Sequence, residues 1–515
     1  MRNGSQRSRS YDLKRQIRRL NEIGIALSSK QNLNDLLEDI VREARHFTQA
    51  DGGSLYIKEG DRLNFTVAQT ESLQNHTVEN KPFESFYLPL TENSIAGYVA
   101  ITGELLNIPD VYELPKRTKY QFNKQYDVKN KYRSKSMLVV PMRDPSGSVI
   151  GVLQLINSLN GDGIVAFKDD YENLVLSLAS QAAVAIQNVK LIEEIKGLFK
   201  SLVQYSAKAI DARSPHTAGH SGRVAKYAVR IANAINEENE GRLGNIYFTQ
   251  TEIEELRIAG WLHDIGKIGV RESVLEKANK LSDDRVEIIR QRFETIKQGI
   301  VLQDLQDQLK GKINGAVNKI SKIGLQSQLK EIDVAYRRIL RLNIPNPFSE
   351  TDAQFLKDLA SKTYLDINGY EQAFITPSEY ENLSISKGNL TAAEYKEIQA
   401  HVLHSFEILN KIPFTKDLKD IPKHAVAHHE YLDGSGYPHG LKGDEISLQA
   451  RILCISDIYD ALSSPDRPYK KATPIKEALF ILKNEADRGK LDPDFVRIFI
   501  KRKLHAVRYD DDDDE

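Results

Sequence analysis

At 515 residues the chain is long enough for two or three domains, each with a substantial core. Apolar residues make up 40% of the chain and charged residues 28%, as in an ordinary folded protein. The net charge of −1 provides no bulk attraction to nucleic acid or to an anionic membrane, and we expect neither as a partner. The single cysteine, Cys454, excludes an internal disulfide framework and indicates a reducing compartment.

The two ends of the chain carry opposite charge. Residues 1–20 are basic and residues 510–515 are wholly acidic, which predicts two solvated tails. No apolar run follows the basic start, so no secretory signal is expected. The longest apolar region, 175–186, contains Ser177, Ser180 and Gln181 and is too short and too polar to span a bilayer. These features predict a cytoplasmic protein.

The first third of the chain predicts an α+β domain. Apolar spacing indicates a helix over 21–50. Short alternating runs predict antiparallel strands at 53–57, 62–67, 137–142 and 149–156. Turn residues at 144–147 predict a hairpin before the last strand. We expect a sensor domain over 21–171.

A long helix is expected from 169 to 212. Its broad apolar stripe continues without a breaker, and a helix longer than one domain needs often pairs with its own copy. We expect residues 172–212 to connect two domains, and we expect two copies of the chain to form a homodimer through this helix. The alternative is a helix that folds back on its own domain.

The rest of the chain has an almost entirely helical pattern. Ser214 and Pro215 combine a serine N-cap with a first-turn proline and predict a helix start. Thr-x-x-Glu patterns at 251–254 and 391–394 predict two more helix starts with capping boxes. We expect an all-α catalytic domain over 213–509.

The stretch at about 290–390 differs from its surroundings. It is rich in Lys, Gln, Asp and Ile at helical spacing, contains no histidine or cysteine, and includes a loop at 343–347. No chemistry is predicted there, and we interpret it as a helical insertion in the second domain.

Histidines and aspartates gather in the second half of the chain. His263 and Asp264 end the helix that starts near residue 251, and they place a nitrogen ligand beside a carboxylate that can bridge two ions. His216 and His220 lie four residues apart, which directs both to one helical face. The remaining candidates are His401, His428, His429 and Asp457.

This set of groups predicts a metal centre. Imidazoles with carboxylates and no thiolate suit borderline first-row ions, so we expect two or three divalent ions, iron or manganese first, with nickel or zinc as alternatives. Asp457 has apolar neighbours, where an unpaired carboxylate is costly and a metal would be its partner. A glycine-punctuated loop at 433–438 follows the histidine pair and holds Tyr437 between a glycine and a proline.

These residues, in this order, resemble the HD-GYP family of cyclic di-GMP phosphodiesterases, a subgroup of the HD phosphohydrolases. The resemblance covers about 205–290 and 390–500 and rests on Gly219-His220-Ser221, His263-Asp264-Ile265-Gly266-Lys267, His428-His429-Glu430, Asp433-Gly434-x-Gly436-Tyr437-Pro438, Ala450-Arg451-Ile452 through Asp457, Tyr459-Asp460-Ala461-Leu462, and Arg467-Pro468-Tyr469-Lys470. It implies hydrolysis of cyclic di-GMP to pGpG, with GMP as the product of a second cut, under control of the sensor domain.

The resemblance also implies a role for each motif residue. Asp264 would bridge the ions, and Lys267 would aid catalysis. Arg467 and Lys470 would hold substrate phosphate, Arg467 through its planar guanidinium group and Lys470 through its compact ammonium group. Asp433 and Tyr437 would border the substrate, in a loop that would also meet partner proteins of the GGDEF type. The implied metal ligands are His220, His263, Asp264, His401, His428, His429 and Asp457.

Two departures from the family pattern stand out. His216 occupies the position where members with three ions carry a glutamate; histidine can still ligate, so His216 is a further candidate and the metal count stays open. In addition, 138 residues separate His263 from His401, far more than in the family. The insertion at about 290–390 falls between these two histidines.

The first domain resembles a GAF domain, a module that binds small molecules. Asn157, Phe167 and Glu172 match part of the signature of cyclic-nucleotide-binding GAF domains, but Ser158 and Tyr171 replace its lysine and aspartate. A different, unknown small-molecule ligand is therefore expected. The domain has no cysteine, which excludes a bilin attached through one.

Three other functions were weighed against the phosphodiesterase. A silent cyclic di-GMP receptor conflicts with the complete ligand set, and an HD hydrolase of another cyclic dinucleotide conflicts with the intact Gly436-Tyr437-Pro438 loop. A purely structural helical scaffold leaves the clustering of histidines unexplained.

Overall fold

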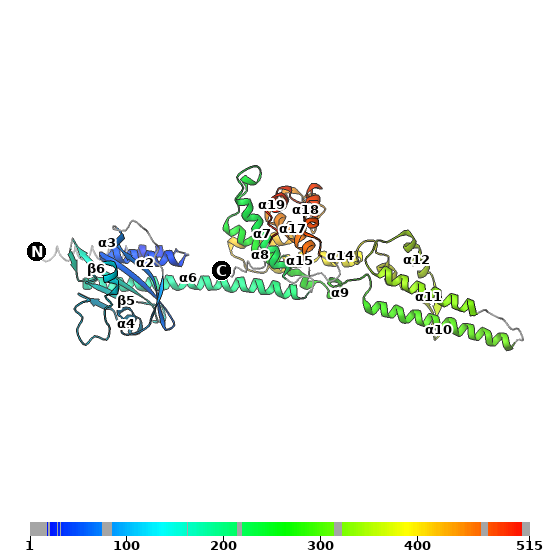
Figure 1. Cartoon of the computed structure of the whole chain (residues 1–515), viewed down its shortest axis with the longest axis horizontal. Coiled ribbons are helices and arrows are strands. Elements are labelled where there is room, and N and C mark those ends of the chain that lie inside the picture. The colour runs from blue at the N-terminus through cyan, green and yellow to red at the C-terminus, as the bar shows by residue number, and fades with distance from the viewer. Residues whose placement is uncertain are drawn as a thin grey trace. The chain divides into compact units, whose positions relative to one another are not determined.

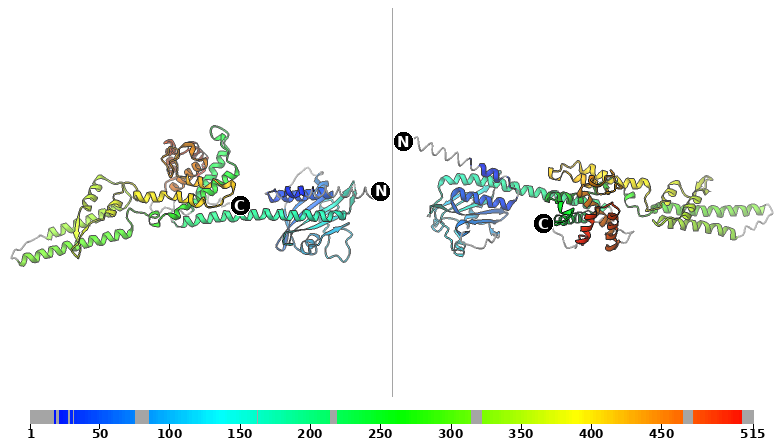
Figure 2. Two further views of the ribbon diagram at one scale, coloured as in Figure 1. Left: turned by 180° about the vertical axis from the view of Figure 1, so that it is seen from behind. Right: turned by 90° about the horizontal axis from the view of Figure 1, so that it is seen from above.

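The computed structural model describes residues 18, 21–27, 29–30, 32–74, 85–161, 163–213, 219–313, 322–464 and 472–506. The chain divides into two compact units at the peptide bond between Phe199 and Lys200. Figure 1 and Figure 2 show strands in the first unit and mainly helices in the second. The expected tails at 1–20 and 510–515 lie outside the described residues, except for Arg18.

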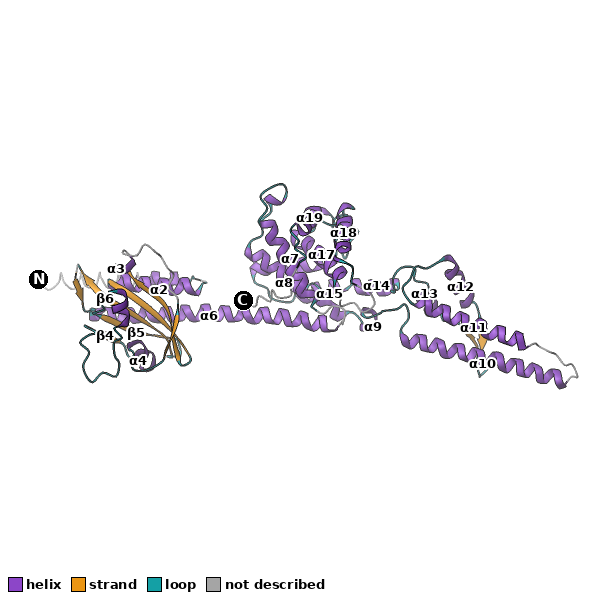
Figure 3. Ribbon diagram, in the orientation of Figure 1, coloured by secondary structure: helices purple, strands orange, loops and turns teal. Residues whose placement is uncertain are grey.

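One antiparallel sheet organises the first unit (Figure 3). The strand order is β3-β2-β1-β6-β5-β4, and β7 pairs with β6. The predicted hairpin between β5 and β6 is confirmed, because the Asp144 carboxylate accepts hydrogen bonds from the backbone N–H groups of Ser146 and Ser148. The strands are β1 (Ala50–Glu59), β2 (Arg62–Thr70), β3 (Phe86–Pro89), β4 (Leu106–Ile108), β5 (Met137–Arg143), β6 (Val149–Asn160) and β7 (Gly163–Val165).

The two faces of the sheet bury separate hydrophobic cores. Side chains alternate along β1, so that Leu55 lies in one core and Tyr56 in the other. The first core is completed by α2 (Leu33–Thr48) and α6 (Asp169–Arg213), and the second by α4 (Ile95–Thr102). The short helices α3 (Glu71–Gln74) and α5 (Gln125–Asn130) complete the unit. The expected α+β architecture is confirmed.

The single helix expected over 21–50 is wrong in detail. Residues 21–27 form one helical segment and α2 begins at Leu33. The side chain of Asn32 caps α2 by accepting hydrogen bonds from the backbone N–H groups of Asn34 and Asp35. An asparagine N-cap takes an extended backbone, which interrupts the helix despite the continuous apolar spacing.

The long helix is confirmed as α6, 45 residues from Asp169 to Arg213. Its first part is built into the sheet core, where Val175, Ala182 and Ile186 are buried. Over Asp169–Ala212 the helix is also long and apolar enough to cross a membrane, with 44% of its most apolar window buried inside the protein. One such helix is weak evidence for a membrane span, because a core helix of a folded domain can pass the same test.

Helices dominate the second unit. Outside 281–383, its described residues contain no strand, in agreement with the expected all-α domain. They form α7 (His220–Asn236), α8 (Gln250–Leu262), α9 (Glu272–Leu275), α14 (Ala392–Gln399), α15 (His401–Leu409), α16 (Ile421–Val426), α17 (Leu448–Ser463), α18 (Ile475–Asp487) and α19 (Pro493–Lys501).

Helix α8 starts two residues before the predicted position. The N-cap is Thr249, paired with Glu252 in a capping box, rather than Thr251 with Glu254. Both pairs fit the pattern, but Thr249 follows the buried Phe248, which stands in the position of a hydrophobic staple. The predicted capping box of Thr391 with Glu394 is confirmed at α14.

Two histidines of the candidate ligand set are the first residues of helices. The helix capped at Thr391 ends at Gln399, and His401 is the first residue of α15. His220 is the first residue of α7, which follows Gly219. The helix start predicted at Ser214 and Pro215 lies outside the described residues.

Residues 281–383 have a hydrophobic core of their own, formed around Phe293, Ile339 and Leu356. The segment departs from the expected helical pattern by one hairpin, in which Asp366 accepts hydrogen bonds from the backbone of Asn368 and Tyr370. Its elements are α10 (Asp283–Ile313), α11 (Lys322–Asn343), α12 (Glu350–Ala360), β8 (Thr363–Leu365), β9 (Glu371–Ala373) and α13 (Pro377–Leu383).

Candidate metal centre

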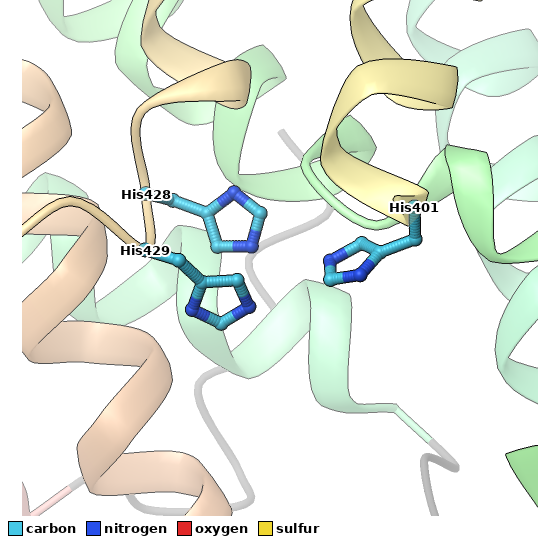
Figure 4. A group of neighbouring side chains, drawn as sticks. All are labelled: His401, His428 and His429. Carbon is cyan, nitrogen blue, oxygen red and sulfur yellow. The ribbon is translucent and has the colours of Figure 1, made fainter. Parts of the chain in front are cut away.

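Seven of the predicted ligands meet in one buried site of the second unit. Helix starts, helix ends and one helix interior supply them: α7 begins with His220, α8 leads into His263 and Asp264, α15 begins with His401, His428 and His429 follow α16, and α17 contains Asp457. Six of the seven form two groups, and within each group the ligand atoms lie within 4.8 Å of one another: His220, His263 and Asp264 in the first, His401, His428 and His429 in the second. Figure 4 shows the three rings of the second group turned towards one space.

Two carboxylates connect these groups. Asp264 places Oδ2 3.6 Å from Nε2 of His220 and Oδ1 3.1 Å from Nε2 of His401. Asp457 places Oδ1 3.2 Å from Nε2 of His220 and Oδ2 3.7 Å from Nδ1 of His429. Each aspartate therefore offers one oxygen to each group, which is the arrangement of a carboxylate that bridges two ions.

The histidine tautomers fit a metal centre. Nδ1 of His263, His401 and His428 lies 2.5 to 2.8 Å from the backbone carbonyl three residues earlier. A carbonyl can only accept, so each Nδ1 carries a proton, and in the neutral ring Nε2 is then the nitrogen with the lone pair. All three Nε2 atoms are buried, and none has a hydrogen-bond partner among the described residues.

His401 and Asp264 also lie close enough to share a cation. Nε2 of His401 is buried and lies within ion-pair distance of the Asp264 carboxylate. A neutral imidazole would present a lone pair at this atom, so both groups could serve as ligands of one cation. The residues present therefore fit divalent ions with imidazole and carboxylate ligands.

Charge in the site favours the ligand forms of these groups. Burial opposes ionisation of Asp264, but the Lys267 ammonium group holds the pKa of its carboxyl well below the usual value. Burial lowers the pKa of His429 to about 4, so this histidine is neutral at pH 7. His220 differs: burial lowers its pKa, but Asp457 and Asp460 outweigh burial and raise it to about 9.

Lys267 lies against the carboxylate of Asp264, with Nζ 2.5 Å from Oδ2. It follows Asp264 by three residues in the 3-10 turn η2 (Ile265–Gly269), which brings the ammonium group back over the carboxylate. Gly266 lets this turn pack closely against α15, because a Cβ there would lie 2.0 Å from the carbonyl oxygen of His401.

Asp460 is a functional candidate to which the sequence assigned no role. It is buried in α17, and its Oδ2 accepts a hydrogen bond from Nδ1 of His220 at 2.8 Å. Arg223 donates to both oxygens of the same carboxylate. Asp460, held in place by Arg223, orients the His220 ring, as second-sphere carboxylates do for metal-binding histidines. Its place three residues after Asp457 was the available signal.

The loop predicted to border the substrate is next to the centre. The Tyr437 ring lies 4.8 Å from the His429 ring, whereas the exposed Asp433 accepts hydrogen bonds from Ser435 within the loop. The buried Glu430 holds the loop by accepting from the backbone N–H groups of His439 and Leu441. The remaining candidates, His216, Arg467 and Lys470, lie outside the described residues.

Models of two domain families match the chain. A GAF domain model matches residues 32–186, one HD domain model matches 217–335, and a second HD domain model matches 372–495. The two HD matches contain all seven residues of the site.

Curated relatives include two enzymes of Vibrio cholerae serotype O1. Its 3'3'-cGAMP-specific phosphodiesterase 3 is 28% identical over 294 residues, which are 57% of this chain and 36% of the relative. Its 3'3'-cGAMP-specific phosphodiesterase 1 is 30% identical over 161 residues, 30% of this chain and 36% of the relative. A cyclic di-GMP phosphodiesterase of Thermotoga maritima is 36% identical over 124 residues, 24% of this chain and 32% of the relative. The chain spans about a third of the length of these relatives.

Proposed function

Because the chain matches models of a GAF domain and of HD domains, we propose that it is an HD-GYP-type, metal-dependent phosphodiesterase that opens cyclic di-GMP. The observation that carries this proposal is the pair of histidine groups joined by Asp264 and Asp457. Hydrolysis would yield linear pGpG, and a second cut would yield GMP.

The chain's own residues prepare such a site in three ways. The backbone carbonyls behind His263, His401 and His428 fix the tautomer and aim each Nε2 inward. Lys267 keeps Asp264 ionised, and Asp460 orients His220. Bound divalent ions would supply Lewis-acid activation of water and neutralise the phosphodiester charge. Iron or manganese suits this ligand set, and nickel or zinc is the alternative.

Substrate contacts form the next part of the proposal. Tyr437 is the described residue that joins the Gly-Tyr-Pro loop to the metal centre, through its ring contact with His429. Arg467 and Lys470 would bind the phosphates, and Asp433 would lie at the edge of the substrate. Partner proteins of the GGDEF type would meet the same loop.

A second candidate substrate is 3'3'-cGAMP. It is favoured by the specificity named for the Vibrio relative whose similarity extends over 294 residues. Cyclic di-GMP is favoured by the higher identity of the Thermotoga relative over 124 residues. The two substrates share the phosphodiester ring and differ in one base, so the proposed metal chemistry serves both.

A product assay separates these functions. Anaerobically purified protein would be loaded with Fe²⁺ or Mn²⁺ and incubated with cyclic di-GMP and 3'3'-cGAMP in parallel. Faster cleavage of cyclic di-GMP, seen as pGpG, supports the proposal. Faster cleavage of 3'3'-cGAMP would instead identify 3'3'-cGAMP as the substrate. Tight binding of cyclic di-GMP without any product would identify a receptor instead of an enzyme. The Asp264→Asn variant is the inactive control.

The proposal also includes regulation and assembly in the cytoplasm. An unknown small molecule bound to the GAF domain would control turnover through α6. Beyond the sheet core this helix has an exposed apolar stripe at alternating spacings of four and three residues: Leu191, Ile195, Leu198, Leu202 and Tyr205. Such spacing is typical of a coiled coil, in which Ile195 and Leu202 would occupy one core position and Leu191, Leu198 and Tyr205 the other. A second copy of the chain would cover this stripe.

A further inference from the structure

Helix α7 begins with the metal-ligand candidate His220, and its own N-cap residue provides no side-chain cap. Its N-cap residue is Gly219, which has a left-handed backbone (φ 67°) and no side chain to accept a hydrogen bond. The first N–H groups of a helix need an acceptor when they are buried. Ser221, the second residue of α7, is fully buried.

The missing cap is supplied by Asp211, two residues before the end of α6. Its Oδ2 accepts a hydrogen bond from the backbone N–H of Ser221 at 3.3 Å, and its Oδ1 accepts one from the Ser221 hydroxyl at 3.0 Å. An anionic carboxylate at a helix N-terminus is also favoured by the helix dipole. One residue thus joins the last turn of α6 to the first turn of α7.

Asp211 is buried next to the centre, with 4% of its surface exposed. Its charge interacts with those of His220, Asp264 and Lys267, which places it in the same electrostatic environment. Its hydrogen bonds, however, go to Ser221, the neighbour of His220. Asp211 therefore acts on the backbone that presents His220, while Asp460 acts on the His220 ring.

We propose that Asp211 is a positioning residue: it caps α7 from α6 and thereby fixes His220 for metal binding, so that the connecting helix is hydrogen-bonded to the start of a ligand-bearing helix. This inference rests on the proposed metal centre. It also identifies the point at which a displacement of α6 would reach that centre, because any shift that separates Asp211 from Ser221 leaves the first turn of α7 without its cap.

The test compares two substitutions in the full-length protein. Asp211→Asn keeps an oxygen acceptor, and asparagine caps helices as well as aspartate does. Asp211→Leu has a similar size and no acceptor. Mn²⁺ binding to the metal-free protein is followed by titration calorimetry, and circular dichroism checks the fold. Asp352→Leu is the control, since it removes an equally buried carboxylate from the segment 281–383.

We expect Asp211→Leu to weaken Mn²⁺ binding by about tenfold or more, the usual effect of losing a second-sphere partner. Asp211→Asn and Asp352→Leu should bind Mn²⁺ as the unaltered protein does. Wild-type affinity in Asp211→Leu would overturn the inference, and so would equal losses in Asp211→Asn and Asp211→Leu, which would point to charge instead of capping.

A further variant covers the case in which Asp211→Leu fails to fold. Ser221→Ala removes the hydroxyl donor and keeps the backbone N–H, so it should weaken Mn²⁺ binding by a smaller factor; unchanged binding would overturn the inference. The titration contains no substrate. Protein that binds Mn²⁺ but cleaves no cyclic dinucleotide would refute the proposed function and leave this inference standing, whereas protein that binds no transition metal would refute both.

Discussion

Asp264 and Asp457 lie on different elements, at the end of α8 and inside α17, and each directs one oxygen to each of the two histidine groups. Two carboxylates shared in this way can hold two cations side by side, and each cation offsets the charge that makes a buried carboxylate costly. With cations bound, the two aspartates would therefore allow the seven ionisable side chains of the site to be buried together.

Replacing Asp264 with Asn should remove both turnover and bound metal. The amide loses the charge that bridges the two groups, and Lys267 loses its anionic partner. We expect elemental analysis to find at most one ion where the unaltered protein holds two or three, with turnover reduced at least about 1,000-fold, since metal activation supplies several kcal/mol. Glu254→Gln, on the exposed face of α8, is the matched control. An Asp264→Asn protein with full metal content and activity would refute the bridging role.

Replacing Asp460 with Ala should weaken metal binding without removing a ligand. His220 would lose the acceptor for its Nδ1–H, so its ring would no longer be held with Nε2 towards the site. We expect the affinity for Mn²⁺ to fall by about 10- to 100-fold, with much of the activity restored at saturating Mn²⁺. Asp460→Asn keeps an acceptor for Nδ1 and should lose less. Equal affinity in all three proteins would show that the carboxylate supports only Arg223.

Metal affinity should rise with pH. In the metal-free protein, Asp457 and Asp460 outweigh burial and raise the pKa of His220 to about 9, so the ring is protonated at pH 7 and a metal must displace that proton. Affinity should increase by up to about tenfold per pH unit from pH 6.5 to 9 and then level off. Mn²⁺ titrations at three pH values test this, and an affinity independent of pH would contradict it.

The same protonation should affect the stability of the metal-free protein with the opposite sign. A raised pKa means that the folded state binds the His220 proton more tightly than the unfolded state, whose pKa is about 6.5. The stabilisation is fully present below pH 6.5 and is lost as pH rises through about 9. Chemical unfolding of the metal-free protein at pH 6.5 and 9 measures it. His220→Gln, which cannot titrate, should lose this dependence.

Replacing Leu198 with Glu should prevent dimer formation through α6. The side chain is 71% exposed at the centre of the apolar stripe, and a buried pair of leucines contributes about 1.5–3 kcal/mol per side chain. Light scattering after gel filtration should report a dimer for the unaltered chain and a monomer for Leu198→Glu. Lys200→Glu changes an exposed residue off the stripe and should stay dimeric. A monomeric unaltered chain would refute the coiled coil.

Removing residues 282–382 should leave the metal centre intact. The segment has its own core, and its two ends are adjacent, since Nζ of Lys280 donates to the Leu383 carbonyl at 3.1 Å. Lys277 also binds Glu394 across the same junction. A linker of about six glycine and serine residues is long enough to join the ends. Unchanged Mn²⁺ affinity is expected; a folded variant that no longer binds metal would show that the segment contributes to the site.

Local patterns in the sequence were sufficient for most of the elements. Strand alternation, the hairpin at 144–147, the unbroken α6 and the capping box at Thr391 depend on neighbours within a few residues, and all four are present. Where two local signals competed, the choice depended on packing. Thr249 and Thr251 fit the same capping pattern, and Thr249 is the cap in a helix entered from the buried Phe248.

The residue types of the metal centre were likewise evident from the sequence, because imidazole and carboxylate clusters are chemically distinctive. The sequence could not show that Asp264 and Asp457 face both groups, that backbone carbonyls aim each Nε2 inward, or that Asp460 and Asp211 support His220 and its helix. These relationships are hydrogen bonds and ion contacts with strict distance and direction, and some join residues 240 positions apart, as His220 and Asp460 are. Only the packing of α6, α7, α8 and α17 around one site decides them.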